Sequence, residues 1–171
     1  LSEERAKLPD RKEGDFPETP RIAPAPHLPA INFSFQTAAQ MTPELAALCP
    51  ECVYVPLELL AENPSVADAF RENGAEIVAA LPSVAFGEKE ESELRALLAK
   101  VHESGVTQAL TGNLGLAMMA GQEGFRIRGD FDLAVMNSYT LSGMASAGFL
   151  SAMLSPELTF ADIREMPKCM D

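Results

Sequence analysis

This chain has few cysteines and no long apolar run, and each of these features excludes a class of protein. Three cysteines in 171 residues are an odd number and too few for a disulfide framework, which agrees with a reducing compartment. No apolar run approaches the roughly 20 residues that span a bilayer. The N-terminus also lacks the basic-then-apolar order of a signal peptide. The sequence therefore predicts a cytoplasmic protein without a membrane partner.

Basic residues are also scarce. Thirteen Lys and Arg stand against twenty-five Asp and Glu, so the formal net charge is −12. This balance disfavours nonspecific attraction to phosphate backbones or anionic membranes. We therefore do not expect this chain to contact RNA by itself, unless a basic neighbouring domain supplies the contact.

Familiar catalytic constellations are missing from the sequence. No Ser-His-Asp, Cys-His or HExxH arrangement can be assembled, which argues against a self-contained hydrolase of familiar type. Cys49 and Cys52 have CxxC spacing, but a structural zinc site needs four ligands and only Cys169 and two scattered histidines remain. We interpret this pair as part of a loop that enters a strand, and no metal ligand is assigned.

Two regions differ in composition. Residues 1–30 are charged and then rich in proline, which predicts an extended linker, whereas residues 31–171 alternate strand-like and helix-like runs. A hydrophobic content of 47% is enough for one domain with a real core. The chain begins at Leu1 without Met, so we expect it to be a piece of a longer protein.

The alternation of runs predicts the fold class. Strands are expected at 31–36, 52–56, 76–81, 107–111, 125–128 and 149–154, and helices at 90–104, 114–122, 138–147 and 159–165, with further helix starts at Thr42 and at Ser65. About six βα units imply parallel strands joined by right-handed crossovers. We predict a (β/α) barrel-like α/β domain that is incomplete in this chain; an open doubly wound sheet is the alternative.

Acidic residues mark the predicted strand ends. Residues 129–133 (GDFDL) place Asp130 and Asp132 after a strand, on one face if the strand continues, and Glu157 follows the next strand. Sites gather at the carboxyl ends of parallel strands, so these three are the candidate catalytic residues. Such acids can bind a divalent cation or divide general acid and base roles. Alternatively, Asp130 caps a loop, Asp132 is solvated and Glu157 favours a helix N-terminus.

Carboxamides occupy the same predicted edge. Gln36, Asn113 and Asn137 are the candidate substrate-binding residues there. Residues 112–115 (GNLG) follow a strand and open a helix, so their backbone amides can face an anion. The segment lacks both GxGxxG and the P-loop lysine, and a tight βα turn that needs two glycines is the alternative account.

Three motifs in this order carry a family resemblance. They are GNLG at 112–115, RGDFDL at 128–133 with Asn137 and Ser138, and LSPELT at 154–159. Together they resemble the collagenase-like peptidase family U-thirty-two, from about residue 31 to the C-terminus, and look most like the second half of its long members.

The resemblance implies a barrel-like fold and a peptidase of unsettled catalytic type. Some relatives are similar to RNA-modifying or quinone hydroxylation enzymes with cysteine-ligated iron-sulfur clusters, but the family's cysteine-rich signature is absent here. The resemblance thus implies no cofactor in this segment, and an iron-sulfur cluster or divalent metal elsewhere in the parent. Members continue into a seventh strand, so the other domains of the parent are expected partners.

A noncatalytic scaffolding half is the competing hypothesis. The chain offers no nucleophile, no cluster ligands and no complete barrel. An incomplete barrel leaves strand edges unpaired, so this hypothesis predicts self-association of the fragment.

Overall fold

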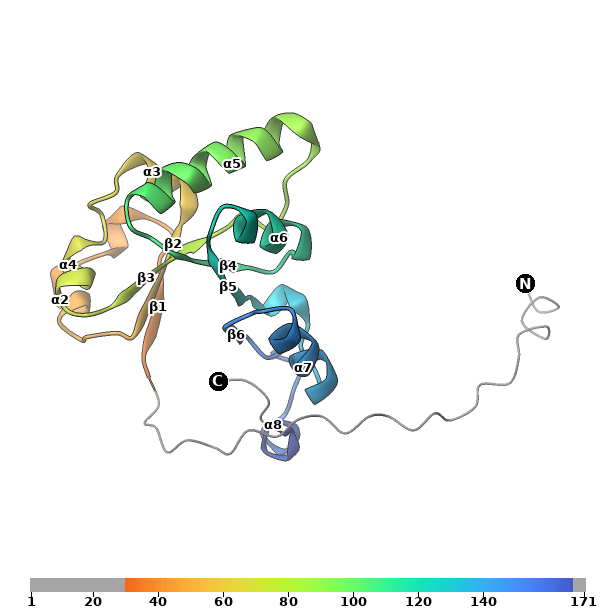
Figure 1. The fold of residues 1–171 in the computed structure, drawn as a ribbon. Helices are drawn as coiled ribbons and strands as arrows, with labels where there is room; N and C mark the ends of the chain where they lie inside the picture. The colour runs from red at the N-terminus through yellow and green to blue at the C-terminus, as the bar shows by residue number, and fades with distance from the viewer. Residues whose placement is uncertain (1–29, 168–171) are drawn as a thin grey trace, which may run out of the picture.

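The fold is a single parallel sheet with helices along the chain between its strands (Figure 1). The computed structural model describes residues 30–167. The strands are β1 (Asn32–Ser34), β2 (Cys52–Pro56), β3 (Glu76–Ala80), β4 (Gln108–Thr111), β5 (Arg126–Gly129) and β6 (Ser151–Ala152). All neighbouring pairs are parallel, and their spatial order is their order along the chain.

The helical elements alternate with these strands. They are η1 (Ala38–Gln40), α2 (Pro43–Ala46), α3 (Leu57–Glu62), α4 (Asp68–Glu72), α5 (Gly87–Glu103), α6 (Leu114–Gln122), η2 (Phe131–Leu133), α7 (Ser138–Ser146) and α8 (Phe160–Glu165). No helix within residues 30–167 is long and apolar enough to cross a membrane.

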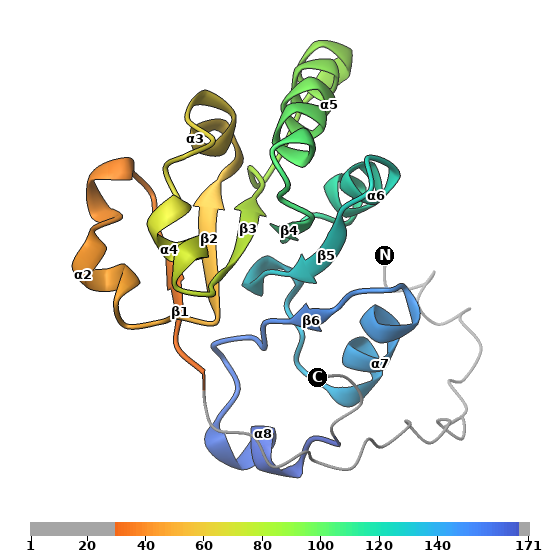
Figure 2. The same ribbon diagram turned by 60° about the vertical axis from the view of Figure 1, so that its left-hand side comes forward.

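The sheet curls into half of a barrel, with helices on its outer side (Figure 2). A doubly wound sheet reverses its strand order at a switch point, whereas the order from β1 to β6 here is strictly sequential. This confirms the predicted incomplete barrel-like fold and excludes the doubly wound alternative for the described residues. Within them, β1 and β6 are the two edges of the sheet.

The two faces of the sheet carry different side chains because successive strand residues point to opposite sides. On the helix side, Val53, Val55 and Ile77 join the main core, which also contains Leu98 of α5 and Phe70 of α4. The other side is the concave face of the half-barrel. A small apolar cluster of Cys52, Val78 and Leu110, with Tyr54 packed against it, lies there.

Most predicted elements are confirmed, with local differences. β6 has only two residues, although an isolated parallel bridge from Val135 to Leu154 extends the contact beyond it. The predicted start at Ser65 is wrong: α4 begins at Asp68 after Ala67, with no side-chain cap, because residues 64–67 form turns. Helix α3 was not predicted. The linker predicted at residues 1–30 lies outside the described residues, apart from residue 30.

Candidate functional site

The strand that carries the acidic pair ends earlier than a continuous strand would. β5 stops at Gly129, and Asp130 becomes the N-cap of η2, where its Oδ1 accepts a hydrogen bond from the Phe131 amide at 2.8 Å. The Asp130 amide still donates to the Thr111 carbonyl at 2.9 Å. The idea that both acids share a strand face is therefore wrong, because Asp132 lies in the 3-10 turn. Both acids nevertheless follow the carboxyl end of β5.

Asp132 packs directly onto the turn that leaves β4. A Cβ placed on Gly112 would collide with the Asp132 Cβ and would lie 3.1 Å from its Oδ2. Only glycine at position 112 allows this close approach. The structure thus brings Asp132 against the GNLG turn, so the motifs around residues 112 and 130 meet at one edge of the sheet although they lie about one βα unit apart in sequence.

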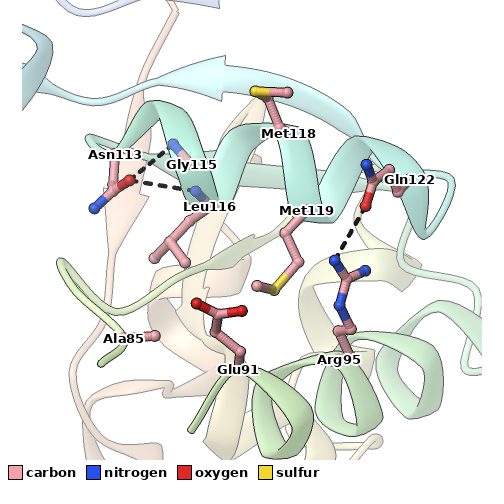
Figure 3. Close-up of a pocket in the computed structure, with 9 residues that line it drawn as sticks. All are labelled: Ala85, Glu91, Arg95, Asn113, Gly115, Leu116, Met118, Met119 and Gln122. Atoms are coloured by element: carbon pink, nitrogen blue, oxygen red, sulfur yellow. Dashed lines mark hydrogen bonds between the residues drawn. The ribbon is translucent and has the colours of Figure 1, made fainter. Parts of the chain in front are cut away.

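Asn113 begins α6. Its Oδ1 accepts hydrogen bonds from the Gly115 amide at 2.9 Å and the Leu116 amide at 3.3 Å, as Figure 3 shows. Its Nδ2 donates to the Ser83 carbonyl at 3.2 Å. Both ends of this carboxamide are therefore engaged in holding the turn, and the α6 N-terminus is capped by a side chain of its own chain.

The other three candidates lie at the ends of β1 and near β6. Asn137 caps α7, because its Oδ1 accepts from the Thr140 amide at 2.9 Å. The exposed Gln36 follows β1, and its backbone amide donates to Gln40 Oε1. Glu157 is exposed, and its amide donates to the hydroxyl of the buried Ser155 at 3.3 Å.

The acids do not converge on a metal site. Within residues 30–167, no group of three His, Cys, Asp or Glu side chains is placed to hold a metal ion. Cys49 is exposed and Cys52 is buried, and both thiols are free. Burial raises the pKa of the Cys52 thiol, although Arg128 lowers it in part, so its metal-binding thiolate is disfavoured. Cys169 lies outside the described residues.

A polar group on the concave face escaped the sequence analysis. We call it the amino-end cluster: Glu76, Gln108, Arg126, Arg128 and Ser151. Glu76 pairs with Arg126 Nη2 at 3.3 Å and with Arg128 Nη2 at 3.6 Å, and it accepts from Gln108 Nε2. Arg128 also donates to Gln108 Oε1 at 2.6 Å and to Ser151 Oγ at 3.1 Å. The sequence signals were a polar first residue on four successive strands and the spacing of Arg126 and Arg128, which places both side chains on one strand face.

Tyr54 lies on the concave face, where charged groups at both ends of the strands shift the pKa of its phenol. Burial raises the pKa of its phenol, Arg128 lowers it in part, and Asp130 adds a smaller upward shift. The phenol is thus within electrostatic reach of the amino-end cluster and of the acid at the carboxyl edge. Sequence reasoning missed Tyr54 because it lies in an apolar strand.

A separate cavity of about 280 Å³ lies between α5 and α6, on the helix side of the sheet (Figure 3). Glu91 of α5 points into it beside Met119 of α6. Arg95 is held by Gln122 Oε1 at 3.1 Å and by Glu123 Oε1 at 3.0 Å. This cavity borders the Asn113 cap, but neither Asp130 nor Asp132 lines it.

Comparison of the chain with protein-family models gives no match, and comparison with curated proteins gives none either. The resemblance to family U-thirty-two therefore stays a prediction that rests on the three motifs.

Proposed function

We propose that this chain is the barrel segment of a hydrolase of the U-thirty-two type, a collagenase-like peptidase, with its reaction site at the carboxyl edge of β4 and β5. The observation that carries the proposal is the packing of Asp132 onto Gly112, next to Asp130. It joins two of the three family-like motifs in one place. Carboxylates at the carboxyl ends of barrel strands are where this fold places its chemistry.

Peptide hydrolysis needs two proton transfers, and two acids supply them. One carboxylate takes a proton from water as the oxygen attacks the carbonyl carbon, and a protonated acid gives a proton to the leaving amine as the C–N bond breaks. Asp130 and Asp132 are the proposed pair, and Glu157 is the third candidate acid. Gln36, Asn113 and Asn137 are assigned to substrate positioning, Asn113 through the turn that it holds.

Any divalent metal or iron-sulfur cluster belongs, in this proposal, to other parts of the parent protein. A divalent metal would polarise the carbonyl or activate the water. The described residues would then orient the substrate and carry protons. The other domains of the parent remain the proposed partners, and the cytoplasm remains the proposed location.

The proposal is tested by incubating the longest available form of the protein with denatured collagen and peptide libraries, and by sequencing new N-termini. Cleavage at reproducible bonds supports a peptidase. A folded protein that cleaves nothing, but shows bound iron with broad visible absorbance when purified without oxygen, contradicts it and favours cluster-dependent RNA or quinone hydroxylation.

A noncatalytic scaffolding half is the second candidate, and one observation favours it. The Oδ1 atoms of Asn113 and Asn137 are engaged in helix caps, and the sheet formed by residues 30–167 has two edges, at β1 and β6. Unpaired strand edges favour association with another chain. In this reading the carboxyl edge is structural, and the function lies in assembly with the rest of the parent.

A further inference from the structure

The amino-end cluster carries a surplus of positive charge in an acidic chain. Its two guanidinium groups surround one carboxylate, that of Glu76, so its formal charge is +1 while the whole chain is −12. The side chain of Arg128 is only 17% exposed, and its three contacts fix its position. The side chain of Arg126 is 57% exposed and makes one ion pair. Arg128 is therefore a fixed positive group, and Arg126 beside it is the more accessible one.

A cavity of about 490 Å³ opens over this cluster, at the amino ends of the strands. Asn32 at the start of β1 and Glu51 just before β2 line it together with the cluster. It lies at the opposite end of the strands from Asp130 and Asp132. It is therefore distinct from the reaction site proposed above, and nothing in that proposal depends on it.

The side chains that line the cavity differ in whether their hydrogen-bonding atoms already have partners. Its neutral acceptors are used within the described residues: Gln108 Oε1 and Ser151 Oγ accept from Arg128, and Asn32 Oδ1 accepts from the Cys52 amide at 3.0 Å. The donors are not exhausted. The side-chain Nδ2 hydrogens of Asn32, the Ser151 hydroxyl hydrogen and the remaining Arg126 N–H groups have no acceptor among residues 30–167.

We propose that this cavity binds a small oxyanion, a carboxylate or a phosphate, with Arg126 as its main contact and Ser151 and Asn32 as neutral donors. Guanidinium groups match both anions through two parallel hydrogen bonds. Arg128 contributes charge and holds Ser151 in position. Glu51 is the opposing group: its exposed carboxylate lines the same cavity, brings the formal charge of the whole lining from +1 to zero and repels an anion there.

Because Arg126 attracts an anion and Glu51 repels it, substitutions at these two positions should change the affinity in opposite directions. Isothermal titration at low salt would use succinate and inorganic phosphate as separate probes, so that the stronger ligand identifies the anion class. Arg126→Met should weaken binding about tenfold or more, since it removes a charge-assisted contact. Glu51→Gln should strengthen binding about twofold or more at low salt, and added salt should shrink that gain.

The matched control is Arg95→Met, which removes another arginine with one acidic partner but lies on the helix side of the sheet. It should leave the affinity unchanged. Arg126→Met should remain folded, because an exposed ion pair contributes little stability. If far-UV circular dichroism showed that Arg126→Met is unfolded, the change in affinity caused by Glu51→Gln would be the test of the proposal. No saturable binding of either anion, or affinities that Arg126→Met and Glu51→Gln leave unchanged, would overturn the proposal.

Discussion

Because of Tyr54 and Cys52, we expect the half-barrel to lose stability at alkaline pH. Burial raises the pKa of both side chains above their ordinary values of 10.0 and 9.0. A raised pKa in the folded state means that folding favours the protonated form. Their contribution to stability is therefore complete below the ordinary values, and it is lost as the pH rises through the raised ones.

Replacing Tyr54 by Phe should reduce the loss of stability at alkaline pH, because the variant keeps the aromatic ring but lacks the ionisable hydroxyl. Urea unfolding at neutral pH and above the ordinary phenol value of 10.0 would measure it. The variant should lose less free energy of unfolding between the two conditions than the original chain, and Cys52→Ala with Tyr54→Phe should lose least. An equal loss in all three proteins would show that these side chains do not cause the effect.

At the residue scale, the sequence located the acids but not their neighbours. Asp130 and Asp132 stand out because two carboxylates follow an apolar strand. The partners of Glu76 lie 32, 50 and 52 residues away in sequence, so the polar residues at the strand starts could not show which side chains pair in the amino-end cluster. The packing of Asp132 onto Gly112 depends likewise on strand pairing between β4 and β5, which local spacing does not specify.

Among the elements, the turn after β4 is the most constrained. Gly112→Ala should destabilise the protein by about 1–3 kcal/mol, since the new Cβ would collide with Asp132 and force the turn or η2 to move. The matched control is Gly143→Ala inside α7, where an added Cβ meets nothing within 4 Å. That change should raise stability by about 0.5–1 kcal/mol, because alanine favours helix.

Thermal and urea unfolding of both variants would measure these effects. Equal stability of Gly112→Ala and the original chain would mean that Asp132 does not pack against this turn.

Element prediction succeeded where caps and periodicity agreed. Helix α6 has the predicted bounds, and the Thr159 cap of α8 is confirmed by its hydrogen bonds with Asp162. Helix α3 was missed because it follows β2 at once, with Pro56 ending the strand and standing at the helix N-cap. No turn separates strand β2 from helix α3, so the sequence carries no local signal for the start of the helix. Strand β6 has two residues and, among residues 30–167, pairs only with β5.

On the scale of the whole molecule, the open half-barrel predicts self-association. Ser34 is an exposed residue on the edge strand β1, and an inward-pointing lysine on an edge strand hinders pairing with another chain. Light scattering under reducing conditions should show concentration-dependent association of the original chain. Ser34→Lys should reduce it, whereas Ser92→Lys on the exposed surface of α5 should not. A monomer at every concentration would contradict the prediction.

At this scale, we propose that the carboxyl edge of the half-barrel, marked by Asp130 and Asp132, performs hydrolysis. Asparagine caps a helix as well as aspartate does, so Asp130→Asn keeps the hydrogen bond to Phe131 and removes only the charge. The most direct measurement is peptide cleavage by the Asp130→Asn, Asp132→Asn double variant of the longest available form of the protein, beside Arg95→Met as control.

We expect a loss of about a hundredfold or more in kcat/KM, the usual contribution of acid–base groups, with an almost unchanged melting temperature and full activity in the control. Cleavage that persists in the double variant, or a loss of activity explained by unfolding, would contradict the assignment of the site.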